Sequence, residues 1–126
     1  MNATTLLLRQ AHPNFMDGDL PTSQVFMPNS EDRGQMSAYD GDQISPDDAY
    51  THYTQVLNKH SHSVWALEKR ETDSNGVPAS PAPLPNFPSH SHVDFSQIAE
   101  GAWRKTAKRL KALAIARGCQ FKPAQQ

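Results

Sequence analysis

The sequence predicts a single α+β domain, in which a small mixed or antiparallel sheet is packed by a long amphipathic C-terminal helix. Short β-prone segments separated by turn residues predict the sheet, and a helical pattern of apolar residues near the end of the chain predicts the helix. The chain has 126 residues, 37% of them hydrophobic, and ten prolines. This composition supports one small core and disfavours an enzyme built around a large cleft between two lobes.

Strands are expected at residues 4–11, 23–27 and 36–39 in the first half of the chain. Each is bounded by proline or by an Asp-Gly-Asp turn, since such residues end regular pairing. Residues 63–71 are expected to form the most buried strand, and residues 90–95 a last short one. The sheet would therefore draw its strands from most of the chain.

Two helices are expected, and both carry start signals. The first should run from residue 46 to about 57, because Ser45 can cap it, Pro46 suits its first position and Asp48 completes a capping-box spacing. Its inward side chains would be Ala49, Tyr53 and Val56 or Leu57. The second should run from about residue 96 to residue 117, with the capping-box spacing of Asp94 and Gln97 before it and Gly118 after it.

The expected domain organisation is one domain with an extended proline-rich connection. Residues 1–71 form its N-terminal part, and residues 90–118 supply the last strand and the basic helix. Residues 72–89 contain five prolines and are expected to cross the surface largely as polyproline II. Residues 119–126 are a tail.

Charge is divided sharply along the chain. Residues 1–100 contain thirteen acidic and only five basic residues, a net charge of −8, whereas residues 101–126 contain seven basic residues and no acidic one, a net charge of +7. This division predicts that the C-terminal region meets something anionic.

The C-terminal helix is expected to gather its basic residues on one face and its apolar residues on the opposite one. The candidate binding residues on this face are Arg104, Lys105, Lys108, Arg109 and Lys111. They could bind a protein partner, contact nucleic-acid phosphates, pair with the acidic part of this chain, or remain solvated. Ile115, which falls within the basic face, favours a protein contact.

Four histidines form two His-x-His pairs, His60/His62 and His90/His92. Residues two apart on a strand share a face, so the two pairs could together hold a zinc ion. The alternative is that they are polar residues beside loops, and the sequence favours this one. No cofactor is predicted, and no phosphate-binding loop, dinucleotide-binding glycine pattern or nucleophile elbow occurs.

Three segments resemble a group of small bacterial proteins of unknown function. They are Leu8-Arg9-Gln10-Ala11-His12-Pro13-Asn14-Phe15, Thr22-Ser23-Gln24-Val25-Phe26-Met27-Pro28 and Ser37-Ala38-Tyr39-Asp40-Gly41-Asp42-Gln43-Ile44-Ser45-Pro46. The resemblance covers about residues 7–95 and implies a small cytosolic protein from bacteria or phage. A weaker resemblance, to ADP-ribosyltransferase-like toxins, would assign roles to Arg9 and His12, Ser23 or Ser37, and Glu68 or Glu71.

The function expected from the sequence is that of a non-enzymatic accessory or adaptor protein. It would work in the cytoplasm, without a membrane partner, and would bind a protein encoded nearby, since no convergent catalytic set is visible. The single cysteine, Cys119, suits a reducing compartment. The alternatives are a nucleic-acid-binding subunit that uses the same helix, and an enzyme with a histidine-bound metal or an ADP-ribosyltransferase-like site.

Overall fold

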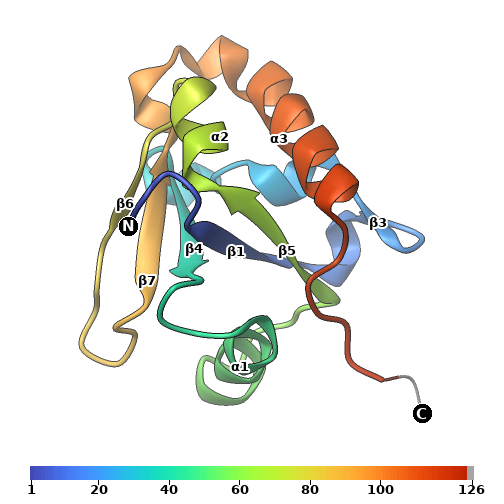
Figure 1. Ribbon diagram of the computed structural model, residues 1–126. Coiled ribbons are helices and arrows are strands. Elements are labelled where there is room, and N and C mark those ends of the chain that lie inside the picture. The colour runs from blue at the N-terminus through green and yellow to red at the C-terminus, as the bar shows by residue number, and fades with distance from the viewer. Residues whose placement is uncertain (125–126) are drawn as a thin grey trace.

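A five-stranded antiparallel sheet forms the centre of the molecule, and helices pack on both of its faces (Figure 1). The computed structural model describes residues 1–124. The strand order is β5-β1-β4-β7-β6, and a hairpin of β2 and β3 forms a second, small sheet. The strands are β1 (Leu6–Ala11), β2 (Met16–Asp17), β3 (Leu20–Pro21), β4 (Gln35–Asp40), β5 (Ser63–Glu68), β6 (Ala79–Pro81) and β7 (His90–Asp94). The predicted α+β class is confirmed.

The helices lie on opposite sides of this sheet. In Figure 1, α2 (Lys69–Ser74) and α3 (Trp103–Arg117) lie above it, and α1 (Pro46–Thr51) lies below it. The last turn of α1 continues as a π-helix over His52–Val56. Short 3₁₀ turns cover residues 13–15, 23–26, 30–32, 95–97 and 100–102. Within residues 1–124, no helix is both long and apolar enough to cross a membrane.

Alternation along the strands divides the core into two layers. The layer on the α3 side is the larger one, and the layer on the α1 side is smaller. The first includes Leu7, Ala38, Trp65, Leu67, Val93 and, from α3, Ala107, Leu110 and Ala114. The second consists of Leu8, Tyr39, Ala49, Val64 and Ala66, with partly buried side chains around them.

The C-terminal helix begins later than the sequence predicts. Asp94 caps a 3₁₀ turn over residues 95–97, accepting a hydrogen bond from the Ser96 backbone N–H at 2.9 Å, and Ile98 is then extended. A second 3₁₀ turn at 100–102 contains Gly101, whose low helix propensity disfavours an earlier start. Ile115, expected on the basic face, is half-buried and packs against the core.

Two further strand predictions need correction. Residues 23–27 do not form a strand; Ser23–Phe26 is a 3₁₀ turn whose apolar residues Val25 and Phe26 are both buried. The buried strand ends at Glu68 rather than at residue 71. There Glu68 and Glu71 form a reciprocal capping box that starts α2.

The proline-rich connection contains more regular structure than the sequence predicts. Its first residues complete α2, and Ala79–Pro81 pairs with β7 as the edge strand β6. Proline is tolerated there because an edge strand leaves one side of its backbone without a ladder partner. In the expected tail, Phe121 pairs with Val64 and lies on the outer edge of β5.

The expected helix at 46–57 is confirmed in extent and in its start. Ser45 accepts a hydrogen bond from the backbone N–H of Asp48, and Ala49 is fully buried. The wider π turn rotates the last side chains of the helix about its axis relative to a regular α-helix. As a result Val56 is 59% exposed, whereas Leu57 is half-buried. Of the two inward candidates at this end, Leu57 is therefore the one that faces inward.

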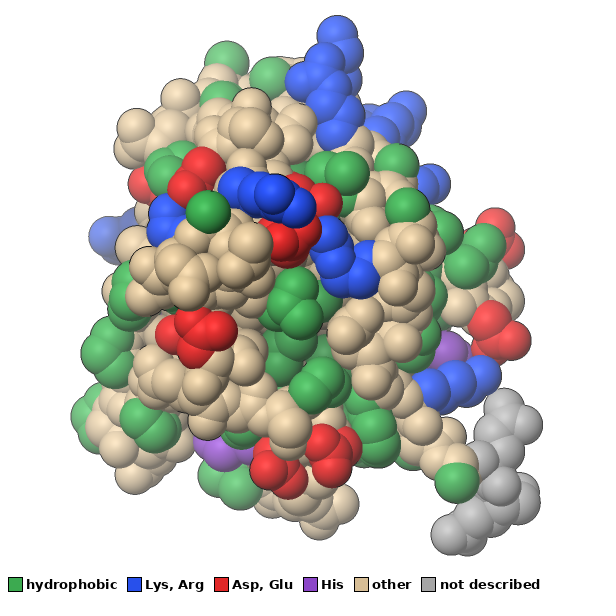
Figure 2. Space-filling model, viewed as in Figure 1, with side chains coloured by type: hydrophobic (Ala, Val, Ile, Leu, Met, Phe, Trp, Pro, Cys, Tyr) green, Lys and Arg blue, Asp and Glu red, His purple; other side chains and the backbone are tan. Residues whose placement is uncertain are grey.

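An ion-pair network fixes the end of α3 to α2. The Arg117 guanidinium donates to the carboxylates of Glu68 at 3.0 Å and Glu71 at 2.8 Å, and to the Ala66 carbonyl at 3.0 Å. Figure 2 shows this group as acidic side chains flanked by basic ones between α2 and α3. Burial opposes ionisation of Glu71, but the hydrogen bonds from Arg117 and from the Glu68 backbone outweigh it and lower the pKa of Glu71.

We expect Leu110→Ala to lower the free energy of unfolding by about 3 kcal/mol, since it removes a fully buried side chain and leaves a cavity beneath α3. Urea denaturation followed by circular dichroism measures this change. Lys108→Ala, on the exposed side of the same helix, is the matched control and should change it by less than about 0.5 kcal/mol. Equal effects of the two substitutions would show that α3 does not pack as described.

We expect Arg117→Gln to cost about 1 kcal/mol near neutral pH, because it removes charge-assisted hydrogen bonds to two partly buried carboxylates. The folded-state pKa of Glu71 is lowered, so its contribution is present above the unfolded pKa and is lost as the pH falls through the folded one. The difference between the two proteins should therefore shrink below about pH 4. Urea melts at pH 7 and pH 3 test this, and a difference that persists unchanged at pH 3 would contradict it.

Candidate functional site

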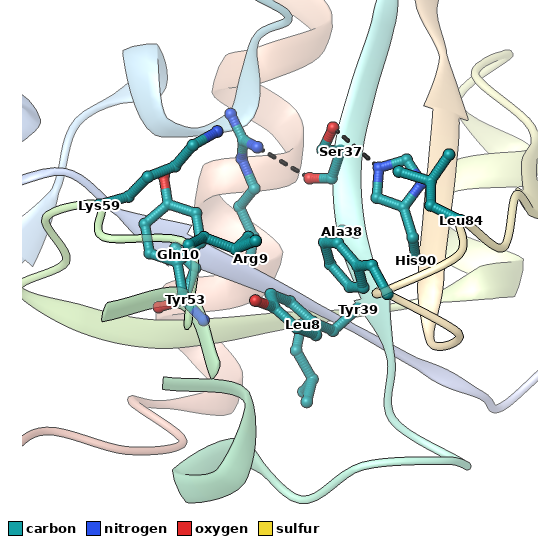
Figure 3. A pocket seen from close by; sticks show the side chains of 12 residues that line it. Leu8, Arg9, Gln10, Ser37, Ala38, Tyr39, Tyr53, Lys59, Leu84 and His90 are labelled. Carbon is teal, nitrogen blue, oxygen red and sulfur yellow. Dashed lines mark hydrogen bonds between the residues drawn. The ribbon is translucent and has the colours of Figure 1, made fainter. Parts of the chain in front are cut away.

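A gap between two central strands creates the main candidate site. β1 pairs with β5 along its whole length, but with β4 only at Leu7–Asp40 and Leu8–Tyr39. Beyond this point the side chain of Arg9 reaches across to β4 and donates to the Ser37 carbonyl at 2.8 Å (Figure 3). A side chain thus replaces the backbone ladder where the strands separate.

The Arg9 guanidinium also holds the 3₁₀ turn at 23–26 against the sheet. Its Nε donates to the Val25 carbonyl at 2.7 Å, and one terminal nitrogen approaches the Met27 carbonyl at 3.4 Å. Burial lowers the pKa of Arg9, and the negative charge of Asp32 acts in the opposite direction. The guanidinium stays protonated at physiological pH, so a cation lies at the floor of the gap.

The π-helical turn supplies the opposite wall. It carries Tyr53, and the chain then reverses at Asn58, whose φ of 54° is in the left-handed region that asparagine tolerates. The Lys59 N–H donates to the Tyr53 carbonyl at 3.1 Å, and the Lys59 ammonium lies 5.8 Å from the centre of the Tyr53 ring. Single π turns recur at functional sites because they redirect side chains in this way.

Two adjoining cavities, each of about 320 Å³, open between these walls. They share the lining residues Arg9, Gln10, Ser37, Tyr53 and Lys59. The first continues over an apolar floor formed by Leu8, Ala38, Tyr39, Leu57, Leu84 and Phe87. The second is more polar and is lined further by His12, Phe15, Val25, Asn29 and Asp32. The site therefore combines a cationic end with an apolar end.

Ser37 and His90 form a hydrogen-bonded pair at the edge of the first cavity (Figure 3). His90 Nδ1 lies 2.8 Å from the Ala82 carbonyl, which only accepts, so the proton of the neutral ring is on Nδ1. Nε2 then accepts from the Ser37 hydroxyl at 3.2 Å. A serine held by a histidine can be an activated nucleophile, but here a neutral carbonyl stands where a carboxylate would stabilise an imidazolium. The pair can fix the wall of the cavity.

Aromatic side chains close the apolar end. The Phe87 ring lies 4.4 Å from Tyr39 and 4.8 Å from His52, measured between ring centres. The Tyr39 hydroxyl is 2.8 Å from His52 Nδ1, and burial raises the pKa of Tyr39 well above its usual range. Tyr39 therefore stays neutral, and as a buried residue it forms part of the cavity lining.

The structure does not assemble the four-histidine zinc site. His60 and His62 precede β5, whereas His90 and His92 lie on β7, and β1 and β4 separate these strands. Within residues 1–124, no group of three or more His, Cys, Asp or Glu side chains could hold a metal ion. His90 and His92 do share a face, with ring centres 4.7 Å apart; burial and the neighbouring His90 lower the pKa of His92.

The ADP-ribosyltransferase-like arrangement is only partly brought together. Arg9, His12 and Ser37 line one cavity. Glu68 and Glu71 lie near the opposite end of β1, where Leu6 pairs with Glu68, and both are engaged by Arg117. The glutamate that such a site needs is therefore missing from the cavity, and this interpretation of the chain is not supported.

The second candidate site is the basic face of α3, defined as Arg104, Lys105, Lys108, Arg109 and Lys111. The first four side chains are exposed and Lys111 is half-buried. Figure 2 shows Lys and Arg side chains projecting above α3. Within the described chain none of the five forms an ion pair, whereas Arg117 and Lys122 do bind carboxylates of the body. Intramolecular pairing therefore explains only the last two cations.

Comparisons with protein-family models, with curated proteins and with solved structures found no match for this chain. The sequence had pointed to Arg9, His12 and Ser37 only through a resemblance. It had not pointed to Gln10, Tyr53 or Lys59 as site residues. One signal was available, because Arg9 interrupts the inward-facing positions of an otherwise apolar strand.

We expect Arg9→Lys to lower the free energy of unfolding by about 2 kcal/mol, because an ammonium cannot bridge the Val25 and Ser37 carbonyls in the fixed geometry of a guanidinium. Urea denaturation measures the change. Arg104→Lys, the same substitution on an exposed helix position, is the matched control and should be nearly silent. Identical unfolding midpoints for Arg9→Lys and the unsubstituted protein would show that Arg9 does not hold the gap together.

Proposed function

We propose that this chain is a small cytoplasmic accessory protein that docks on the acidic surface of a partner protein through the basic face of α3. The observation that carries the proposal is the set of five cations without intramolecular carboxylate partners among residues 1–124. They project from a helix whose other side is fixed in the core. The resemblance to small bacterial proteins supports a bacterial complex and a partner encoded nearby.

Two features favour a protein partner over nucleic acid. Residues 1–100 carry a net charge of −8, which would repel a phosphate backbone that approached beyond the helix itself. The second half of α3 exposes Ala112 and Ala116 beside the basic residues. Small apolar side chains next to cations suit the mixed surface of a protein interface, whereas phosphate binding would gain little from them.

The test is the triple substitution Arg104→Gln, Lys108→Gln and Lys111→Gln. It should weaken partner binding by about ten- to a hundredfold, if each cation contributes about 0.5–1 kcal/mol to a complementary interface. The fold should persist, because Thr106, Ala107, Leu110 and Ala114 supply the buried side of the helix. Co-purification from the native host, followed by titration of the recovered partner, measures the effect.

A matched control removes three basic residues elsewhere, Arg33→Gln, Arg70→Gln and Lys122→Gln, and so changes the net charge equally. It should leave partner binding unchanged. Recovery of no stoichiometric partner, or equal loss in both triple variants, would overturn the proposal. A DNA column tests the nucleic-acid alternative. The face would be assigned to nucleic acid if the binding constant for DNA fell with salt at a log–log slope of roughly −3 to −4. Only the α3 variant should then lose retention on the column.

A further inference from the structure

The gap between β1 and β4 holds two cations that have no carboxylate within ion-pair distance in the described chain. Arg9 has five N–H groups, and three of them meet backbone carbonyls. Lys59 is an exposed residue that lines both cavities with Arg9, and its ammonium lies 5.8 Å from the centre of the Tyr53 ring. The carboxylate that lines the second cavity, Asp32, accepts from the Asn29 backbone N–H at 3.1 Å. Two like charges facing one cavity repel each other, and a bound anion would remove that repulsion.

An unpartnered polar group lines the same space. The Gln10 side chain is almost fully buried, with 7% of the residue exposed. Its Oε1 accepts from the Ser61 hydroxyl at 2.7 Å, whereas its Nε2 has no partner. Nε2 has less than 1 Å² of accessible surface, so it lies behind the cavity wall and is not itself a contact for a ligand.

The charged ends gather at one side of the cavity. Figure 3 shows the Arg9 guanidinium, the Lys59 ammonium and the Tyr53 hydroxyl turned toward the same side, above Leu8 and Tyr39. These three groups can all donate hydrogen bonds to an oxyanion. The arrangement separates a site for negative charge from a site for apolar surface.

The opposite end of the cavity can receive a ring. Leu8, Tyr39 and Phe87 line it, and the Tyr39 hydroxyl is already engaged by His52, so this end offers a ligand apolar surface rather than a hydrogen bond. Offset or edge-to-face packing of a ligand ring on such side chains stabilises it beyond the burial of apolar area. A cavity of about 320 Å³ is at the lower end of the range for small-molecule sites.

We propose that this cavity binds a small organic anion with one aromatic or apolar ring. Its oxyanion is held by Arg9, Lys59 and the Tyr53 hydroxyl, and its ring lies on Leu8, Tyr39 and Phe87. The oxyanion is a carboxylate or a phosphate, two groups that the same donors bind. This site is separate from the basic face of α3 and does not depend on the proposed partner.

The test is a titration of the full chain with phenyl phosphate and with benzoate up to 10 mM, followed by ¹H–¹⁵N NMR. At least one of the two probes should bind saturably and shift the resonances of Gln10, Ser37 and Lys59, and the tighter one identifies the oxyanion. Benzyl alcohol, which keeps the ring without the charge, should bind at least fivefold more weakly. The proposal is overturned if neither anion binds, or if the alcohol binds as well as the anions.

Two variants avoid the risk that Arg9 substitutions unfold the protein. Lys59→Gln and Tyr53→Phe should each weaken the better anion by about threefold or more, without changing the binding of benzyl alcohol. Lys69→Gln, on α2, is the matched control and should bind like the unsubstituted chain. Unchanged anion affinity in both Lys59→Gln and Tyr53→Phe would overturn the assignment of the oxyanion site.

Discussion

The hydrogen bonds of one guanidinium hold the two halves of the sheet together where their ladder stops. Arg9 joins β1 to the Ser37 carbonyl of β4 and to the Val25 carbonyl of the 3₁₀ turn beneath α3. Without these bonds, buried carbonyls would lose their partners at a cost comparable to a substantial part of a small domain's stability. The cavity exists because this contact is a side chain: a continuous backbone ladder would bring β1 and β4 to about 4.8 Å and close it.

The wall opposite Arg9 depends on the π turn after α1. A regular α-helix through residue 57 would place Val56 and Tyr53 on the same inward stripe, since residues three apart are neighbours. The wider turn leaves Val56 exposed and keeps Tyr53 half-buried at the cavity. The left-handed Asn58 then ends the helix and brings Lys59 back over the Tyr53 ring. The turn that places Tyr53 and Lys59 beside Arg9 therefore also leaves Val56 exposed.

The sequence predicted the fold better than the site, and the difference has a physical cause. Alternation and turn residues located β1, β4 and β7, because burial on a pleated sheet imposes a period of two. They did not locate the 3₁₀ turn at 23–26, where Val25 and Phe26 are adjacent and both buried, nor the start of α2 within a predicted strand. The cavity forms where β1 and β4 stop pairing, and no local sequence pattern predicts that position. Gln10, Tyr53 and Lys59 meet there only through tertiary structure.

The molecule uses its cations in two contrasting ways. Arg9 is desolvated and fixed by backbone carbonyls, so ions in solution screen its field little. The basic face of α3 is exposed, and its attraction to any partner weakens beyond a Debye length of about 8 Å at physiological salt. Arg117 and Lys122 are paired within the molecule. Arg117 binds Glu68 and Glu71, and Lys122 binds Asp19. Two of the seven C-terminal cations, Arg117 and Lys122, therefore bind carboxylates of the body, and the five on the basic face of α3 are left to act outward.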